Sequence, residues 1–122
     1  MTRKESAIAF LTMVAHGNIR EAYEKFISMK FIHHNQYFQG DRQSLMLAMK
    51  EAGKTNPNKK LEIKKIFEDG DIVITVSHVQ QNPDDIGSAV VHLFRFEDDQ
   101  IVELWDLGQQ IVKDSPNENG VF

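Results

Sequence analysis

An Asp69-Gly70 dipeptide between two segments rich in β-branched residues is the feature that most constrains the fold of this chain. Asp-Gly in this setting is the strongest local signal for a β-hairpin and predicts a type I′ turn. A two-residue loop formed by this dipeptide would place Leu61 opposite His78. Because most side chains on that face are apolar, we expect His78 to point to the interior side of the sheet.

A second hairpin is predicted further along the chain, and its register can be argued from side-chain chemistry. A two-residue loop at Asp98-Asp99 would place His92 opposite Trp105. A three-residue loop from Asp98 to Gln100 instead places His92 opposite Asp106. The three-residue loop is preferred because it pairs opposite charges with one another and apolar side chains with one another.

The preferred register makes three further pairs, namely Arg95 with Glu103, Phe96 with Val102, and Phe94 with Leu104. We expect the first of these to be an ion pair on the outer face of the sheet. The loop contains no glycine, although such loops need a residue with positive φ. Asp99 or Gln100 must therefore adopt that conformation.

The first half of the chain has helical periodicity. Ile8, Leu11 and Val14 recur at helical spacing, and Gly17 can end that helix. Asn18 with Glu21 resembles a capping box that opens a second helix, and Asp41 can cap a third helix that ends at Gly53. Helices followed by strands predict an α+β fold. We expect one domain over residues 1–122, with a polar C-terminal tail from about 113 to 122.

Composition excludes several classes of function. The 122 residues include no cysteine, which rules out disulfides and thiolate chemistry. A formal net charge of −4 argues against a nucleic-acid surface, and the lysines at 59–60 and 64–65 are interpreted as a solvated strand face. No apolar run approaches the roughly 18 residues that span a bilayer, so no membrane partner is expected. The N-terminus lacks an apolar signal core, and a cytoplasmic location is the expectation.

The second hairpin therefore carries the candidate chemistry. Its inner face would hold Phe96, Phe94, His92, Val102, Leu104 and Asp106. Directly opposed Cβ atoms lie about 4.5–5.5 Å apart, so the Asp106 carboxylate can reach the His92 imidazole. On an apolar wall, such a pair can act as an acid–base pair with pKa values shifted toward neutrality. The alternative is a buried pair that only satisfies its own hydrogen bonds.

Two sequence segments resemble a known family. Residues 90–106 read VVHLFRFEDDQIVELWD, with Gln109 shortly after, and residues 32–35 read IHHN. The first segment resembles the closing hairpin of the SnoaL-like polyketide cyclase branch of the NTF2-like superfamily. The second segment is similar to the aliphatic-x-His-Asn signature of that family. The order of elements is also similar, and the resemblance extends from about Lys4 to Gln110.

The resemblance implies an NTF2-like cone, in which a curved antiparallel sheet wraps around three N-terminal helices and encloses one deep pocket. Family members include cyclases that close rings by aldol condensation without metal or organic cofactor. By this resemblance Asp106 would be the general base, and His92 or His34 would stabilise or protonate the oxyanion. Candidate substrate-binding residues are His78, Phe94, Leu104 and Gln109.

The remaining histidines are interpreted as lying outside the site. His33 and His34 alternate, so one of them should face outward, and the family pattern favours His34 as the inward residue. His16 precedes Gly17 and is most simply a residue at a helix C-terminus that interacts with the helix dipole.

Three functional hypotheses follow. The leading one is a cofactor-independent cyclase or isomerase that acts on a small carbonyl compound, and the alternative is a non-catalytic protein that binds an apolar metabolite. A metal site formed by His34, His78, His92 and Asp106 is disfavoured because the spacings match no short ligand motif. The resemblance also implies a homodimer through the outer sheet face, where Trp105, Leu93, Val91 and Leu107 would form an apolar patch.

Overall fold

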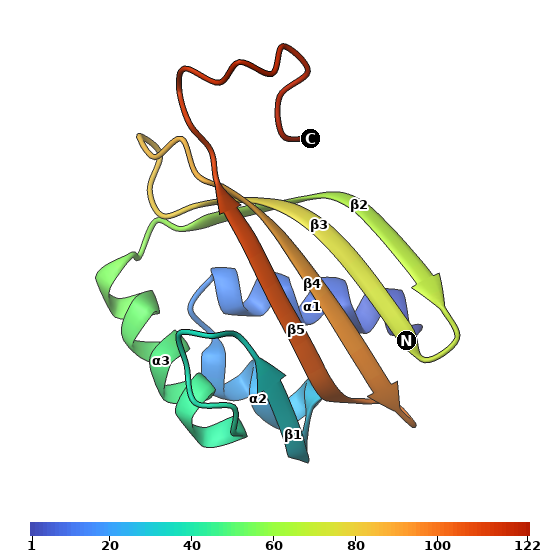
Figure 1. Cartoon of the computed structure of the whole chain (residues 1–122). Helices are drawn as coiled ribbons and strands as arrows, with labels where there is room; N and C mark the ends of the chain where they lie inside the picture. The colour runs from blue at the N-terminus through green and yellow to red at the C-terminus, as the bar shows by residue number, and fades with distance from the viewer.

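The computed structural model describes all 122 residues and contains three helices and one five-stranded sheet (Figure 1). The elements are α1 (Arg3–Ala15), α2 (Ile19–Phe26), β1 (Ile27–His34), α3 (Arg42–Thr55), β2 (Lys60–Asp69), β3 (Ile72–Gln80), β4 (Ser88–Glu97) and β5 (Gln100–Gln110). The helices lie against one face of the sheet, which confirms the predicted α+β cone. The strand order is β1-β5-β4-β3-β2, and β1 pairs parallel with β5. The sheet is therefore mixed and not wholly antiparallel as predicted.

The helix ends follow the predicted signals in part. The Asp41 side chain accepts a hydrogen bond from the Ser44 backbone N–H at 2.9 Å, which confirms the cap of α3. Gly17 has a positive φ of 85° after α1, as predicted. Asn18 makes no side-chain capping bond, so the predicted capping box of α2 is wrong. Helix α3 continues two residues past Gly53, because this glycine keeps a helical conformation.

The β2–β3 hairpin exists, but its register is not the predicted one. Asp69 pairs with Ile72, so the loop is Gly70-Asp71, and only Gly70 has positive φ. Glycine at the first loop position is the pattern of a type II′ turn, not of the predicted type I′ turn. The one-residue shift and a bulge near Lys64 place His78 opposite Glu62.

This register turns His78 away from the interior. The buried residues of β3 are Val73, Thr75, Ser77 and Val79, and His78 lies on the opposite face from them. Its ring Nε2 donates a hydrogen bond to the Ile86 carbonyl at 2.9 Å. The prediction that His78 faces the interior is wrong, because a one-residue slip moves every side chain of a strand to the other face.

The β4–β5 hairpin combines the two registers considered from the sequence. Glu97 pairs with Gln100 around a two-residue loop, and a bulge in β5 at Val102 then shifts the pairing. Beyond the bulge His92 pairs with Asp106, as the preferred register predicts. The predicted pairing of Phe96 with Val102 is wrong, since Phe96 pairs with Ile101.

Two other predictions for this hairpin have different outcomes. Arg95 and Glu103 are opposite one another, and Arg95 Nε donates to Oε1 of Glu103 at 2.8 Å, which confirms the ion pair. The positive φ of the turn is supplied by Asp98, at 54°, and not by Asp99 or Gln100.

A single core joins the helices to the inner face of the sheet. Phe10 of α1 packs edge-on against Tyr23 of α2, with ring centroids 5.7 Å apart, and against Phe94 of β4 at 6.2 Å. Apolar burial of this kind stabilises the fold by about 25 cal/mol per Å². No helix is long and apolar enough to cross a membrane.

Candidate active site

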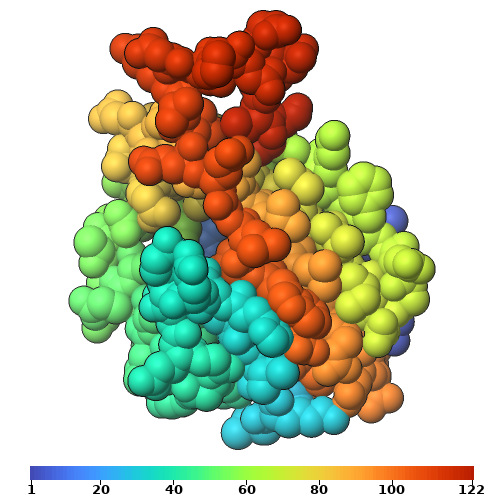
Figure 2. All heavy atoms as spheres, viewed as in Figure 1, coloured from blue at the N-terminus to red at the C-terminus, as the bar shows by residue number.

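A pocket of about 370 Å³ lies between the helices and one end of the sheet. Side chains from α1, α3 and the strands β2 to β5 line it, and most of them are hydrophobic. Its polar side chains are His16, Asn56, Lys59, Gln81, His92 and Asp106. Figure 2 shows a hollow between β5 and the connection from β1 to α3. The volume is in the range of small-molecule sites.

Asp106 is the only carboxylate that lines the pocket. Its side chain is 24% exposed, and its Oδ1 lies 3.8 Å from Nε2 of His92. Its Oδ2 lies 3.9 Å from Nε2 of His33 and accepts a hydrogen bond from Nδ2 of Asn35 at 3.3 Å. Both imidazole distances exceed hydrogen-bond length, so the two rings flank the carboxylate without a direct hydrogen bond to it.

Strand register explains how the two histidines reach Asp106. His92 is directly opposite Asp106 in the antiparallel β4–β5 pair. His33 pairs with Leu104 in the parallel β1–β5 pair. Since residues two positions apart share a face, Leu104 and Asp106 both point inward, and His33 lies diagonally across from Asp106.

Both histidines are kept neutral by their surroundings. Burial lowers the pKa of His33 and that of His92, although the negative charge of Asp106 acts in the opposite direction on each. Both ring nitrogens of His33 and the Nδ1 of His92 are buried without a hydrogen-bond partner. A neutral imidazole keeps one N–H, so each ring can donate a hydrogen bond to an oxygen beside the carboxylate.

Of the residues predicted from the sequence, Asp106, His92 and Leu104 line the pocket together. Phe94 lies on the same face but is fully buried, and it packs in the core and not on the pocket wall. Gln109 is exposed on β5 and does not line the pocket. The structure therefore brings together three of the seven predicted site residues.

His34 and His78 are outside the pocket. The His34 side chain is 45% exposed, stacks on Trp105 at 4.8 Å and donates from Nε2 to Oε2 of Glu103 at 2.6 Å. The expectation that His34 faces inward and His33 outward is wrong. The four residues considered as metal ligands are consequently not brought together, because His34 and His78 lie on the outer face.

The alternation of side chains along β1 indicates from the sequence that His33 points inward. Phe31 has the same parity as His33, and both are buried, with nearly parallel rings 6.4 Å apart. A large aromatic residue favours the core face, so Phe31 indicates which histidine points inward. The family pattern alone favours the other residue.

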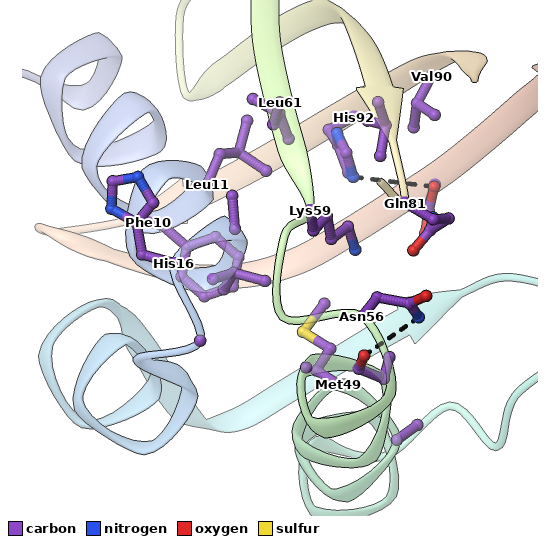
Figure 3. Close-up of a pocket in the computed structure, with 18 of the residues that line it drawn as sticks. Phe10, Leu11, His16, Met49, Asn56, Lys59, Leu61, Gln81, Val90 and His92 are labelled. Atoms are coloured by element: carbon purple, nitrogen blue, oxygen red, sulfur yellow. Dashed lines mark hydrogen bonds and ion pairs between the residues drawn. The ribbon is translucent and has the colours of Figure 1, made fainter. Parts of the chain in front are cut away.

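Lys59 is a further site residue that sequence analysis missed. It lies in the connection between α3 and β2 and lines the pocket, so the interpretation of this lysine as part of a solvated face is wrong. Burial lowers the pKa of its amine, and the nearby Asp106 carboxylate opposes this shift. Figure 3 shows Lys59 and His92 in the same pocket. Periodicity cannot reveal such a contact, because the residue precedes the strand.

The family of the chain is decided by a direct comparison. The family model for SnoaL-like polyketide cyclases matches residues 6–112. The chain belongs to this family. The match includes every residue described above around Asp106. No curated protein matches the sequence of this SnoaL-like chain.

Solved structures share the fold of this SnoaL-like protein at low sequence identity. An NTF2-like protein of unknown function from Cytophaga hutchinsonii is 19% identical, with a TM-score of 0.72 over 89% of this chain and 91% of that chain. A protein with the provisional name polyketide cyclase, from Acidithiobacillus ferrooxidans, is 21% identical, with a TM-score of 0.73 over 88% and 87% of the two chains. An NTF2-like protein of unknown function from Burkholderia xenovorans is 14% identical, with a TM-score of 0.74 over 93% and 88%. These similarities show the NTF2-like fold.

Proposed function

We propose that this SnoaL-like protein is a cofactor-independent cyclase or isomerase that acts on a small carbonyl compound, with Asp106 as the general base. One observation carries the proposal: a carboxylate in an apolar pocket is flanked by two buried imidazoles, His33 and His92, whose pKa values are lowered by burial. A structural ion pair would bring charged partners into hydrogen-bond contact, which neither imidazole makes here.

The chemical step uses these groups in sequence. Asp106 removes a proton from the carbon next to a carbonyl, and the electron pair moves onto the carbonyl oxygen to give an enolate. A neutral imidazole N–H of His92 stabilises that oxygen by a hydrogen bond. The enolate carbon then forms a bond to a second carbonyl carbon, and the new alkoxide takes the proton held by Asp106. The step is balanced without an oxidant, a reductant or a metal.

The first half of this step can be tested without the natural substrate. 2-Tetralone is an apolar bicyclic ketone, and its exchange of α-hydrogen for deuterium in D₂O can be followed by NMR. We expect the protein to accelerate exchange, and Asp106→Asn to reduce the rate by about 10²–10⁴-fold while the fold is retained. The matched control is Asp99→Asn, because Asp99 is an exposed carboxylate in the β4–β5 turn, remote from the pocket lining.

The alternative function predicts a different result. A non-catalytic pocket protein would bind 2-tetralone without accelerating exchange. That outcome, or an Asp106→Asn variant with full exchange activity, would contradict the proposed enzyme.

The outer face of the sheet supports a second copy of this chain as a partner. Phe67, Ile74, Leu93 and Trp105 are in register across four neighbouring strands and form a continuous apolar row on this face. Leu107, on the same face, is 66% exposed. A two-fold axis would bury this patch against itself, which is the usual arrangement of a homodimer. Sedimentation should show a dimer that Leu93→Glu dissociates, whereas Leu47→Glu, at an exposed position of α3, should leave it intact.

A further inference from the structure

Lys59 is the only lysine or arginine among the residues that line the pocket. Its charge is the opposite of that of Asp106, the only carboxylate there. Two other lysines of the chain have carboxylate partners: Lys30 pairs with Glu97, and Lys64 pairs with Glu62. Lys59 forms no ion pair and no side-chain hydrogen bond, and so its three donors are free within the pocket.

The surroundings of Lys59 make an unpaired amine unfavourable. Apolar side chains such as Leu61 and Met49 line the same pocket, and burial lowers the pKa of the amine. A charged group withdrawn from water is stabilised when an opposite charge binds to it, and a charge-assisted hydrogen bond is stronger in such a site than in water. A bound anion would therefore supply the negatively charged partner that no side chain of the protein provides to Lys59.

The position of Lys59 relative to His92 and Asp106 also indicates how a ligand could lie in the pocket. In Figure 3 the Lys59 side chain lies in the pocket on the side that also holds His92. Asp106 and Lys59 line the same pocket without an ion pair between them, and the Asp106 carboxylate opposes the downward shift in the pKa of the Lys59 amine. A ligand can therefore contact Lys59 at one end while its reacting carbon lies at Asp106.

We propose that Lys59 binds a carboxylate group of the substrate, so that the pocket takes a carbonyl compound with an apolar body and one carboxylate. This inference rests on the proposed function and names the substrate class of the same site.

The charges around the site favour a monoanion. A phosphate group carries more negative charge than a carboxylate, whereas Lys59 is the only lysine or arginine of the pocket, and its other polar side chains are His16, Asn56, Gln81, His92 and Asp106. The Asp106 carboxylate would repel a dianion more strongly than a monoanion. A carboxylate matches both the single cation and the mostly apolar lining.

A matched pair of probes tests this inference by binding alone. 2-Naphthoate and 2-naphthamide have nearly the same shape and differ in charge, and their affinities can be measured by isothermal titration calorimetry at neutral pH. We expect the wild-type protein to bind 2-naphthoate at least tenfold more tightly than 2-naphthamide. Lys59→Met should abolish this preference through a loss of at least tenfold in affinity for 2-naphthoate, and Lys59→Arg should retain the preference.

Lys60→Met is the matched control, because Lys60 is the neighbouring lysine but is exposed and does not line the pocket. It should bind both probes as the wild type does. Equal affinity of the wild type for the two probes, or a preference that survives in Lys59→Met, would overturn the inference. Because these measurements need no turnover, failure here is distinct from failure of the deuterium-exchange test of Asp106.

Discussion

His33 Nε2 lies 3.9 Å from Oδ2 of Asp106, on the opposite side of the carboxylate from the oxygen that faces His92. The His33 side chain is fully buried, and neither of its ring nitrogens has a hydrogen-bond partner. Residues on β1, β4 and β5 thus converge on one carboxylate. The site is therefore an arrangement of three residues, and the hairpin supplies only two of them.

His33 and His34 should differ sharply in their effect on catalysis. His33→Gln is expected to lower the rate of 2-tetralone deuterium exchange by about tenfold or more, because it removes one of the two imidazoles beside Asp106. His34→Gln is the matched control and should change the rate less than about twofold, since its side chain pairs with Glu103 on the outer face. Circular dichroism would establish that both variants fold. Equal losses in the two variants would contradict the assignment of His33 to the site.

The stability of the protein should fall on acidification below pH 6.5. Burial lowers the pKa values of His33 and His92 below the ordinary value of 6.5, so the unfolded chain binds protons that the folded chain resists. Stability is then greatest above pH 6.5 and decreases as pH falls from there through the folded-state pKa values. Thermal unfolding followed at several pH values should show a midpoint that drops by several degrees toward pH 5.

The double variant His33→Asn/His92→Asn isolates this effect. It should show a shallower dependence of the unfolding midpoint on pH over the same window, because asparagine does not titrate. Asp106, Lys59 and His34 are the charged or titratable groups that act on these two rings, and all three remain in the variant. A slope equal to that of the wild type would assign the acid sensitivity to other groups.

Phe94 should behave as a core residue and not as a substrate contact. Its side chain is fully buried and packs against Phe10 and His92, with centroid distances of 6.2 and 5.8 Å. Phe94→Ala is expected to lower the free energy of unfolding by about 3–5 kcal/mol in denaturant titrations. Leu47→Ala, at an exposed position of α3, should change it by less than about 0.5 kcal/mol. Similar values for the two variants would contradict the placement of Phe94.

The β4–β5 turn offers a stabilising substitution. Asp98 has a φ of 54°, a conformation that favours glycine over residues with a Cβ atom. Asp98→Gly should raise the free energy of unfolding by up to about 1 kcal/mol. Asp99→Gly is the control in the same turn, and it should be neutral or destabilising because Asp99 has negative φ. A destabilised Asp98→Gly variant would contradict this expectation. It would show that the Asp98 side chain stabilises the fold by more free energy than the strained backbone conformation costs.

Local patterns in the sequence were sufficient for the three helices, for the strands β2 to β5 and for the pair formed by His92 and Asp106, whereas β1 was too short for its periodicity to be read. The pairing of Arg95 with Glu103 and of Phe94 with Leu104 satisfies charge and hydrophobicity on both faces at once, which leaves one acceptable register for that part of the hairpin. The turn itself was less predictable. A bulge at Val102 allows a two-residue loop to coexist with the register expected for a three-residue loop.

Only the tertiary structure decided which histidines join Asp106. Alternation along β1 requires one of His33 and His34 to face inward, and Phe31 favours His33, but only the parallel pairing of β1 with β5 brings His33 diagonally across from Asp106. A one-residue shift in β2–β3 likewise moved His78 to the outer face, and the connection after α3 brought Lys59 into the pocket. The physical reason is common to all three. Side-chain periodicity shows which residues share a face of a strand. Strand register and the packing of distant segments determine which of the two faces becomes the interior.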